Sequence, residues 1–134
     1  LASAFPERTI YAVDSGEIRT GLQQAGTRIN RDDLCAYARH LPNVVPIYSC
    51  SGKLDVSSLK NVVGVFVDGD HSYSGVLRDA ALCDKIRPSL AAYHDCYYGQ
   101  AAWVGVNKVL SDRHDRFRNV WHAAGTWLAF ESYP

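Results

Sequence analysis

The sequence has no excess of charge of either sign, no cluster of basic residues and no long apolar run. Its 14 lysines and arginines balance 14 aspartates and glutamates, so the formal net charge is zero. Proteins that bind nucleic acid gather Lys and Arg on one surface, so this balance argues against a nucleic-acid partner. No apolar stretch is long enough to cross a bilayer, which argues against a membrane protein. At 134 residues and 47% hydrophobic composition, the chain fits one globular domain, residues 1–134.

Closely paired cysteines and a leader sequence are also missing. No two of the four cysteines, Cys35, Cys50, Cys83 and Cys96, are spaced as C-x-x-C, so a zinc or redox motif has little support. Four cysteines would still be enough for two disulfides in an oxidising compartment. Cys35 and Cys83 fall on apolar helical faces, which favours buried reduced thiols. The first six residues lack the basic start and apolar core of a signal peptide. Together these features predict a cytoplasmic protein.

The most informative stretch that is present joins an apolar run to acids and histidine. Residues 62–67, Val-Val-Gly-Val-Phe-Val, predict a buried parallel strand, and Asp68-Gly69-Asp70-His71 follow at once. Residues 90–93 predict a second strand, which ends in His94-Asp95. Apolar residues at helical spacing over 74–86 predict a helix between them. Because ligands of open α/β sheets sit just beyond the carboxyl ends of the strands, we expect these acids and histidines to share one crevice.

The order of the other elements predicts the fold class. Strands alternate with helices along most of the chain, and Ala124-Gly125 near its end is typical of a hairpin turn. This order predicts an α/β protein whose sheet is mostly parallel, with a C-terminal antiparallel hairpin. The expected elements are a helix end over residues 1–7, strands at 9–14, 44–48, 117–123 and 126–131, and helices at 30–41, 56–59 and 103–111.

Five short motifs in this order resemble those of a known family. They are Val67-Asp68-Gly69-Asp70-His71-Ser72-Tyr73, Gly75-Val76-Leu77-Arg78-Asp79, Arg87-Pro88, Tyr93-His94-Asp95 and Gly105-Val106. The set is similar to class I S-adenosylmethionine-dependent methyltransferases, in the branch of sugar and macrolide O-methyltransferases. The resemblance covers most of the chain, from Thr9 to the terminal hairpin. It implies a Rossmann-like fold, S-adenosylmethionine as cofactor, and a small-molecule substrate such as a sugar whose hydroxyl receives the methyl group.

The resemblance implies three residues that bind the cofactor. Asp14, at the end of the first strand, matches the acid that binds the ribose hydroxyls. A carboxylate suits a diol because it accepts two hydrogen bonds. Ser51 matches part of the turn that contacts adenine, and Asp68 matches the acid near the reactive sulfonium.

The resemblance also implies a general base and, in some members, a metal. Asp70 or His71 matches the base that takes the proton from the acceptor hydroxyl. In metal-dependent members, Asp68 and Asp95 match residues that hold Mg²⁺. Cys96 stands where those members have a further acid, and a thiol is a poor ligand for a hard cation, so metal binding is left open.

Two departures from the family pattern concern missing glycines. No Gly-x-Gly occurs anywhere, although the family has a glycine-rich loop after its first strand. Either the chain is an incomplete domain that lacks this loop, or it is a decayed relative. A sheet without its first strand would leave an edge that needs cover, which leaves a homo-oligomer open. The second departure is Ser89 in a turn where the family has two glycines, which makes the turn stiffer.

Simpler interpretations stand beside these. Asp68 and Asp70 would also suit the N-terminus of the following helix, and His94-Asp95 would also suit a structural pair that closes a strand. Residues 112–116 are typical of a solvated connector, and Trp121 and Trp127 are expected to fill core. Two further functions remain open: a non-catalytic relative that acts as a structural or interaction module, and a metal-dependent hydrolase using Asp68, Asp70, His71 and Asp95.

Overall fold

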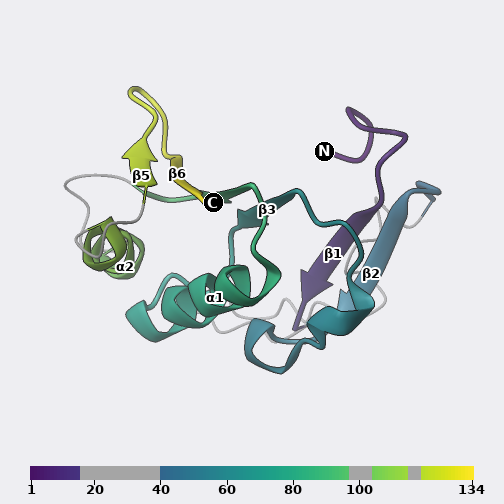
Figure 1. Cartoon of the computed structure of the whole chain (residues 1–134), viewed down its shortest axis with the longest axis horizontal. Coiled ribbons are helices and arrows are strands. Elements are labelled where there is room, and N and C mark those ends of the chain that lie inside the picture. Colours follow the sequence, from purple (N-terminus) through teal and green to yellow (C-terminus); the bar gives the residue numbers. More distant parts are fainter. Residues whose placement is uncertain (16–39, 97–103, 115–118) are drawn as a thin grey trace, which may run out of the picture. The chain divides into compact units, whose positions relative to one another are not determined.

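The computed structural model describes residues 1–15, 40–96, 104–114 and 119–134. It divides into two compact units, an N-terminal unit, Leu1–Leu54, and a C-terminal unit, Asp55–Pro134. The described residues form a small α/β protein with a two-strand parallel sheet and a four-strand mixed sheet (Figure 1). No helix in the described ranges is both long enough and apolar enough to span a membrane.

The N-terminal unit is built on two parallel strands. They are β1 (Ile10–Asp14) and β2 (Val44–Tyr48), paired from Ile10 opposite Val44 to Asp14 opposite Tyr48. Both strands confirm the sequence prediction. A 3₁₀ turn, η1 (Ser51–Lys53), follows β2. The helix predicted over residues 30–41 lies almost wholly outside the described residues.

The helix end expected over residues 1–7 is wrong, because these residues form turns. Pro6 has no backbone N–H, so a helical ladder cannot continue through it. Backbone carbonyls of this segment also accept hydrogen bonds from a side chain rather than from a helical backbone. The side-chain amide of Asn43 lies within 3.1 Å of three backbone carbonyl oxygens, those of Ala2, Phe5 and Arg8.

The C-terminal unit begins with the strand–helix–strand segment that the sequence predicts. After a 3₁₀ turn, η2 (Val56–Ser58), come β3 (Gly64–Val67), α1 (Tyr73–Ile86) and β4 (Leu90–Tyr93). β3 and β4 are parallel, as predicted. Ser72 caps α1 by accepting a hydrogen bond from the Gly75 N–H, which explains why the helix begins where it does. Arg87 directly follows α1 and ends the helix with a left-handed φ of 53°.

The rest of this unit adds one helix and the predicted hairpin. α2 (Val104–His114) is followed by β5 (Asn119–His122) and β6 (Ala129–Ser132). The strand order is β3-β4-β6-β5, and β6 is antiparallel to both of its neighbours. Among the described ladders, two are parallel and two antiparallel, so the sheets are more mixed than the expected mostly parallel sheet.

The core of this unit lies between one face of the four-strand sheet and the two helices. Side chains alternate along a strand, so Val65 and Val67 of β3 face this core while Phe66 points to the other face. Phe66 is 49% exposed. The prediction that this strand is buried is therefore wrong. β3 is an edge strand of the four-strand sheet, and both helices pack on the face away from Phe66. The core residues are Val76, Ala80, Cys83, Ala91, Tyr93, Cys96, Val106, Val109, Leu110, Ala129 and Tyr133.

Arg113 at the end of α2 is the centre of a buried polar network, which corrects the expectation of a solvated connector. Its guanidinium pairs with Glu131, with a shortest contact of 2.8 Å, and with Asp84 at 2.8 Å. Glu131 is fully buried, and its carboxylate also accepts hydrogen bonds from the Tyr93 and Tyr133 hydroxyls. The network thus ties together both helices, β4, β6 and the residue after β6. Of residues 112–116, the last two lie outside the described residues.

Burial also changes the titration of groups around Arg113. Burial raises the pKa of the Cys83 thiol to about 12 and raises the pKa of both tyrosine hydroxyls, Tyr93 and Tyr133. Cys83 is a free, buried thiol, as the sequence predicts. Cys50 and Cys96 are also free, while Cys35 lies outside the described residues.

The two hairpin tryptophans are not core residues, contrary to expectation. Trp121 is 47% exposed and Trp127 is 50% exposed. Trp121 lies on the sheet face opposite the helices, where its ring stacks on Phe130 of the neighbouring strand with centroids 5.8 Å apart. Alternation along β5 places Val120 on the core face instead, where it packs against the core.

Candidate functional site

The site forms where β3 and β4 end. Because the two strands are parallel and Val67 is paired with Tyr93, the residues that follow them emerge at the same edge. The pairing continues one step further, since the His94 N–H donates to the Val67 carbonyl at 2.9 Å. Asp68 therefore lies beside His94 and Asp95, as the sequence predicts.

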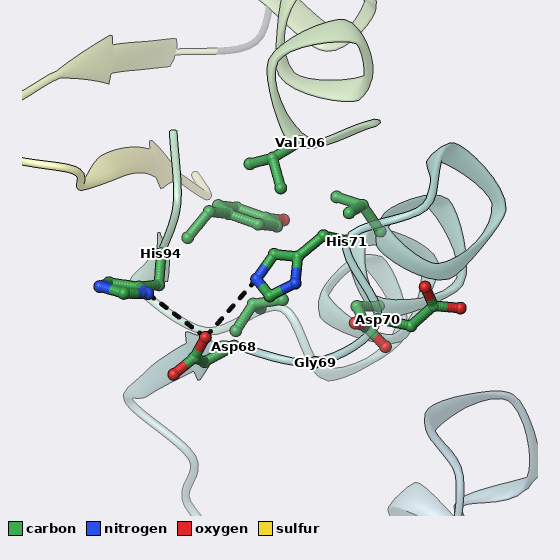
Figure 2. Close-up of a pocket in the computed structure, with 10 residues that line it drawn as sticks. Asp68, Gly69, Asp70, His71, His94 and Val106 are labelled. Atoms are coloured by element: carbon green, nitrogen blue, oxygen red, sulfur yellow. Dashed lines mark ion pairs between the residues drawn. The ribbon is translucent and has the colours of Figure 1, made fainter. Parts of the chain in front are cut away.

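Four side chains form what we term the Asp–His cluster: Asp68, His71, His94 and Asp95. The His71 Nε2 lies 2.7 Å from the Asp95 Oδ2 and 3.7 Å from the Asp68 Oδ1. The His94 Nδ1 lies 3.3 Å from the Asp68 Oδ1 and 3.2 Å from the Asp95 Oδ1. Figure 2 shows the two imidazoles on opposite sides of the Asp68 carboxylate. Each histidine thus contacts both acids.

Three members of the cluster could hold a divalent cation. One ligand atom from each of Asp68, His71 and Asp95 lies within 4.8 Å of the others. Two carboxylates and an imidazole suit Mn²⁺, Fe²⁺ or Zn²⁺, whereas Mg²⁺ would use the carboxylate oxygens. The Cys96 thiol is not part of this group, because its sulfur donates to the Asn107 Oδ1 on α2 at 3.2 Å. The same distances also suit direct ion pairs between the acids and the histidines, with no cation between them.

Asp95 is held in an unusual backbone conformation. Its φ of 57° is left-handed, a region that non-glycine residues adopt only at some cost. The next residue fixes this turn, because the Cys96 N–H donates to the Trp127 carbonyl at 3.0 Å. The turn leaves the Asp95 side chain 9% exposed and facing His71. Sequence patterns carry no signal for this conformation.

Asp70 lies outside the Asp–His cluster, although the sequence offers it as a base on equal terms with His71. Its carboxylate accepts a hydrogen bond from the Ser72 N–H at 2.9 Å and pairs with Arg78 at 3.3 Å. These are the contacts of a carboxylate at a helix N-terminus. Asp70 therefore serves the N-terminus of the following helix, which is the simpler of the two interpretations given by the sequence. Asp68 instead makes its contacts with histidines. Asp70 still lines the small pocket beside the cluster, together with Val67, Tyr93 and Val106.

Two glycines allow close packing around the loop that carries His71. A Cβ added to Gly75 would collide with the Asp70 backbone carbonyl. A Cβ added to Gly105 would collide with the His71 carbonyl and the Tyr73 backbone nitrogen. Both glycines belong to the motifs that carry the family resemblance. Because glycine is unfavourable inside a helix, its presence at these two helical positions is a sequence signal for such close packing. The first turn of α2 therefore presses directly on the loop that positions His71.

Replacing Gly105 with alanine is expected to lower the free energy of unfolding by about 1–3 kcal/mol, because the methyl group must displace backbone. Chemical denaturation measures this. Gly64→Ala is the matched control, since its added Cβ would meet only the Leu90 carbonyl at 3.8 Å. Equal effects of the two substitutions would show that α2 does not constrain the loop.

The other two expected cofactor residues lie in the N-terminal unit. Asp14 is the last residue of β1 and is exposed, and Ser51 begins η1 after β2. The parallel pairing brings the carboxyl ends of β1 and β2 together, and the Ser49 N–H donates to the Asp14 carbonyl at 3.0 Å. Their roles remain predictions.

No family model and no curated protein matches this sequence. The evidence for function is therefore the geometry of the Asp–His cluster and the motifs that form it.

Proposed function

We propose that the protein is an S-adenosylmethionine-dependent methyltransferase that methylates a hydroxyl of a small molecule. The observation that supports it best is the meeting of Asp68, His71 and Asp95 at the shared edge of β3 and β4. These residues belong to the motifs that resemble the sugar and macrolide O-methyltransferases. The antiparallel C-terminal hairpin and the helix between β3 and β4 agree with that family. The Rossmann-like architecture and the cofactor contacts of Asp14 and Ser51 belong to the same proposal.

In this proposal, His71 is the general base. Its Nδ1 would take the proton of the acceptor hydroxyl, whose oxygen would receive the methyl group that the cofactor supplies, and the cofactor would be released as the neutral thioether S-adenosylhomocysteine. The Nε2 lies 2.7 Å from Asp95 and would donate its own proton to that carboxylate, so Asp95 would orient the imidazole and stabilise its protonated form. Asp68 carries the negative charge that attracts the sulfonium and orients the acceptor. Holding both reactants in line supplies most of the rate enhancement.

A divalent cation is an optional part of the proposal. Asp68 and Asp95 would hold it, and a cation there would favour the ionised form of the acceptor hydroxyl. His71 would then remain the proton acceptor. The absence of a third acid at Cys96 makes a weakly held cation more consistent with this chain than a permanently bound one.

Calorimetric titration of the purified protein with S-adenosylmethionine tests the proposal. We expect heat of binding, and transfer of radioactive methyl from the cofactor to a hydroxyl compound. No heat at millimolar cofactor would reject the methyltransferase and favour the non-catalytic relative, which the missing Gly-x-Gly supports.

The metal-dependent hydrolase remains a weaker alternative. The Asp68, His71 and Asp95 group would suffice for one cation. Two-metal chemistry needs further ligands, and Asp70 is committed to Ser72 and Arg78. Chelator-sensitive phosphoesterase activity would favour this alternative.

A further inference from the structure

We propose that an aromatic strip beside the Asp–His cluster, formed by Phe66, His94 and Trp127, binds the flat face of a ring-shaped, uncharged acceptor. This inference rests on the proposed function, because it names the substrate class of the same site. Its member His94 lies on the side of Asp68 away from His71 (Figure 2).

The contacts within the strip place two exposed rings close to that of His94. The His94 ring centroid lies 6.1 Å from that of Phe66 and 6.3 Å from that of Trp127, with tilts of 42° and 45°. Phe66 and Trp127 are each about half exposed. His94 links the strip to the reactive groups, because its Nδ1 contacts both acids of the cluster. An acceptor lying on the rings would thus have an edge near the carboxylates.

The backbone around Trp127 is fixed, although its side chain is exposed. The Trp127 carbonyl accepts from the Cys96 N–H, which directly follows Asp95. The Thr126 hydroxyl donates to the Ala123 carbonyl at 2.8 Å and accepts from the Leu128 N–H at 3.1 Å. A large aromatic side chain held in this way gives contact area at a small entropic cost.

The chemistry of the strip and cluster identifies the class of acceptor. Aromatic faces favour apolar, flat partners, whereas the cluster favours a hydroxyl that can donate a proton. The site presents two acids, and Arg78, which reaches the same loop, is paired with Asp70. An anionic acceptor would meet repulsion there. A neutral ring with hydroxyls on its edge fits, whether it is a phenolic ring or the apolar face of a sugar.

The test compares Trp127→Ala with Trp121→Ala, a matched control on an equally exposed tryptophan of the same hairpin. The probes are catechol, methyl α-D-glucopyranoside and glycerol, with Kd measured by calorimetry in Mn²⁺ without S-adenosylmethionine. We expect Trp127→Ala to weaken binding of at least one ring probe by about 10-fold, the effect of losing one aromatic contact, and to leave glycerol unchanged. Trp121→Ala is expected to change none of them, and Trp127→Phe to recover most of the loss.

The ring probe that is affected identifies the source, catechol for a phenolic acceptor and the glucoside for a sugar. The proposal is overturned if both alanine variants behave alike, if glycerol is affected as much as the rings, or if neither ring binds the parent protein. Because binding is measured without cofactor, its result is independent of methyl transfer. If Trp127→Ala weakens ring binding as expected but the protein binds no S-adenosylmethionine, the role of the strip is supported and the methyltransferase proposal is rejected.

Discussion

Replacing Arg113 with alanine is expected to lower the free energy of unfolding by about 3–5 kcal/mol, because it leaves a buried carboxylate without its cation. That carboxylate is Glu131, which is fully buried and receives the Arg113 guanidinium at 2.8 Å. The arginine itself is only 11% exposed. The loss is large for a domain of this size, since whole domains are stable by about 5–15 kcal/mol. Urea or guanidinium denaturation measures it.

Lys108→Ala provides the control for Arg113→Ala. Lys108 lies on the same helix and pairs with Asp112, but its side chain is 59% exposed. An exposed pair of this kind contributes about 0–1 kcal/mol, so little change is expected. The double variant Arg113→Met with Glu131→Leu is expected to recover part of the stability, because it removes both buried charges. If Arg113→Ala cost no more than Lys108→Ala, the network would have no structural role.

Replacing Asp95 with asparagine is expected to reduce methyl transfer by about 10²–10⁴-fold, the usual contribution of general base catalysis. Asparagine fills the same volume and tolerates the left-handed φ of 57°, so the fold should be retained. It removes the charge that orients His71 at 2.7 Å. Steady-state turnover and Mn²⁺ titration of the same preparation measure the two consequences, slower methyl transfer and weaker cation binding.

Asp112→Asn is the control for the loss of one carboxylate charge. Asp112 accepts a hydrogen bond from the Tyr73 hydroxyl and pairs with Lys108 on α2. It should leave turnover unchanged. Asp68→Asn is expected to abolish methyl transfer with the fold intact, as Asp68 contacts both histidines. Unchanged turnover in Asp95→Asn would remove the carboxylate–imidazole pair from the mechanism.

The sequence predicted most of the elements that position the site. The apolar runs before Asp68 and before His94 specified β3 and β4, and apolar residues at helical spacing between these strands specified α1. Because parallel strands end at the same edge, these local patterns were enough to predict that Asp68 and Asp95 lie together. The hairpin of β5 and β6 followed from its Ala-Gly turn in the same way.

Other features depended on which elements pack together. Arg113 sits in a charged run that is typical of a solvated segment, and only the approach of α2 to β6 buries it against Glu131. Trp121 is apolar enough to suggest core, yet the described helices cover the opposite face of the sheet, and Trp127 lies half exposed in the turn of the hairpin. Hydrophobicity alone cannot say which face of a strand is covered.

What the sequence by itself determined was therefore the chain order of strands and helices and the edge at which the acids emerge, since periodicity and turn chemistry act over a few residues. Only the tertiary structure decided that His71, and not Asp70, joins the acids. Asp70 is held by its capping contacts at the start of α1. The close approach of Gly105 fixes the backbone of the next residue, His71, whose side chain faces Asp95. The left-handed turn at Asp95 also depended on a contact more than 30 residues away in sequence, between Cys96 and Trp127. Such distant contacts leave no local pattern, because their geometry is set by packing.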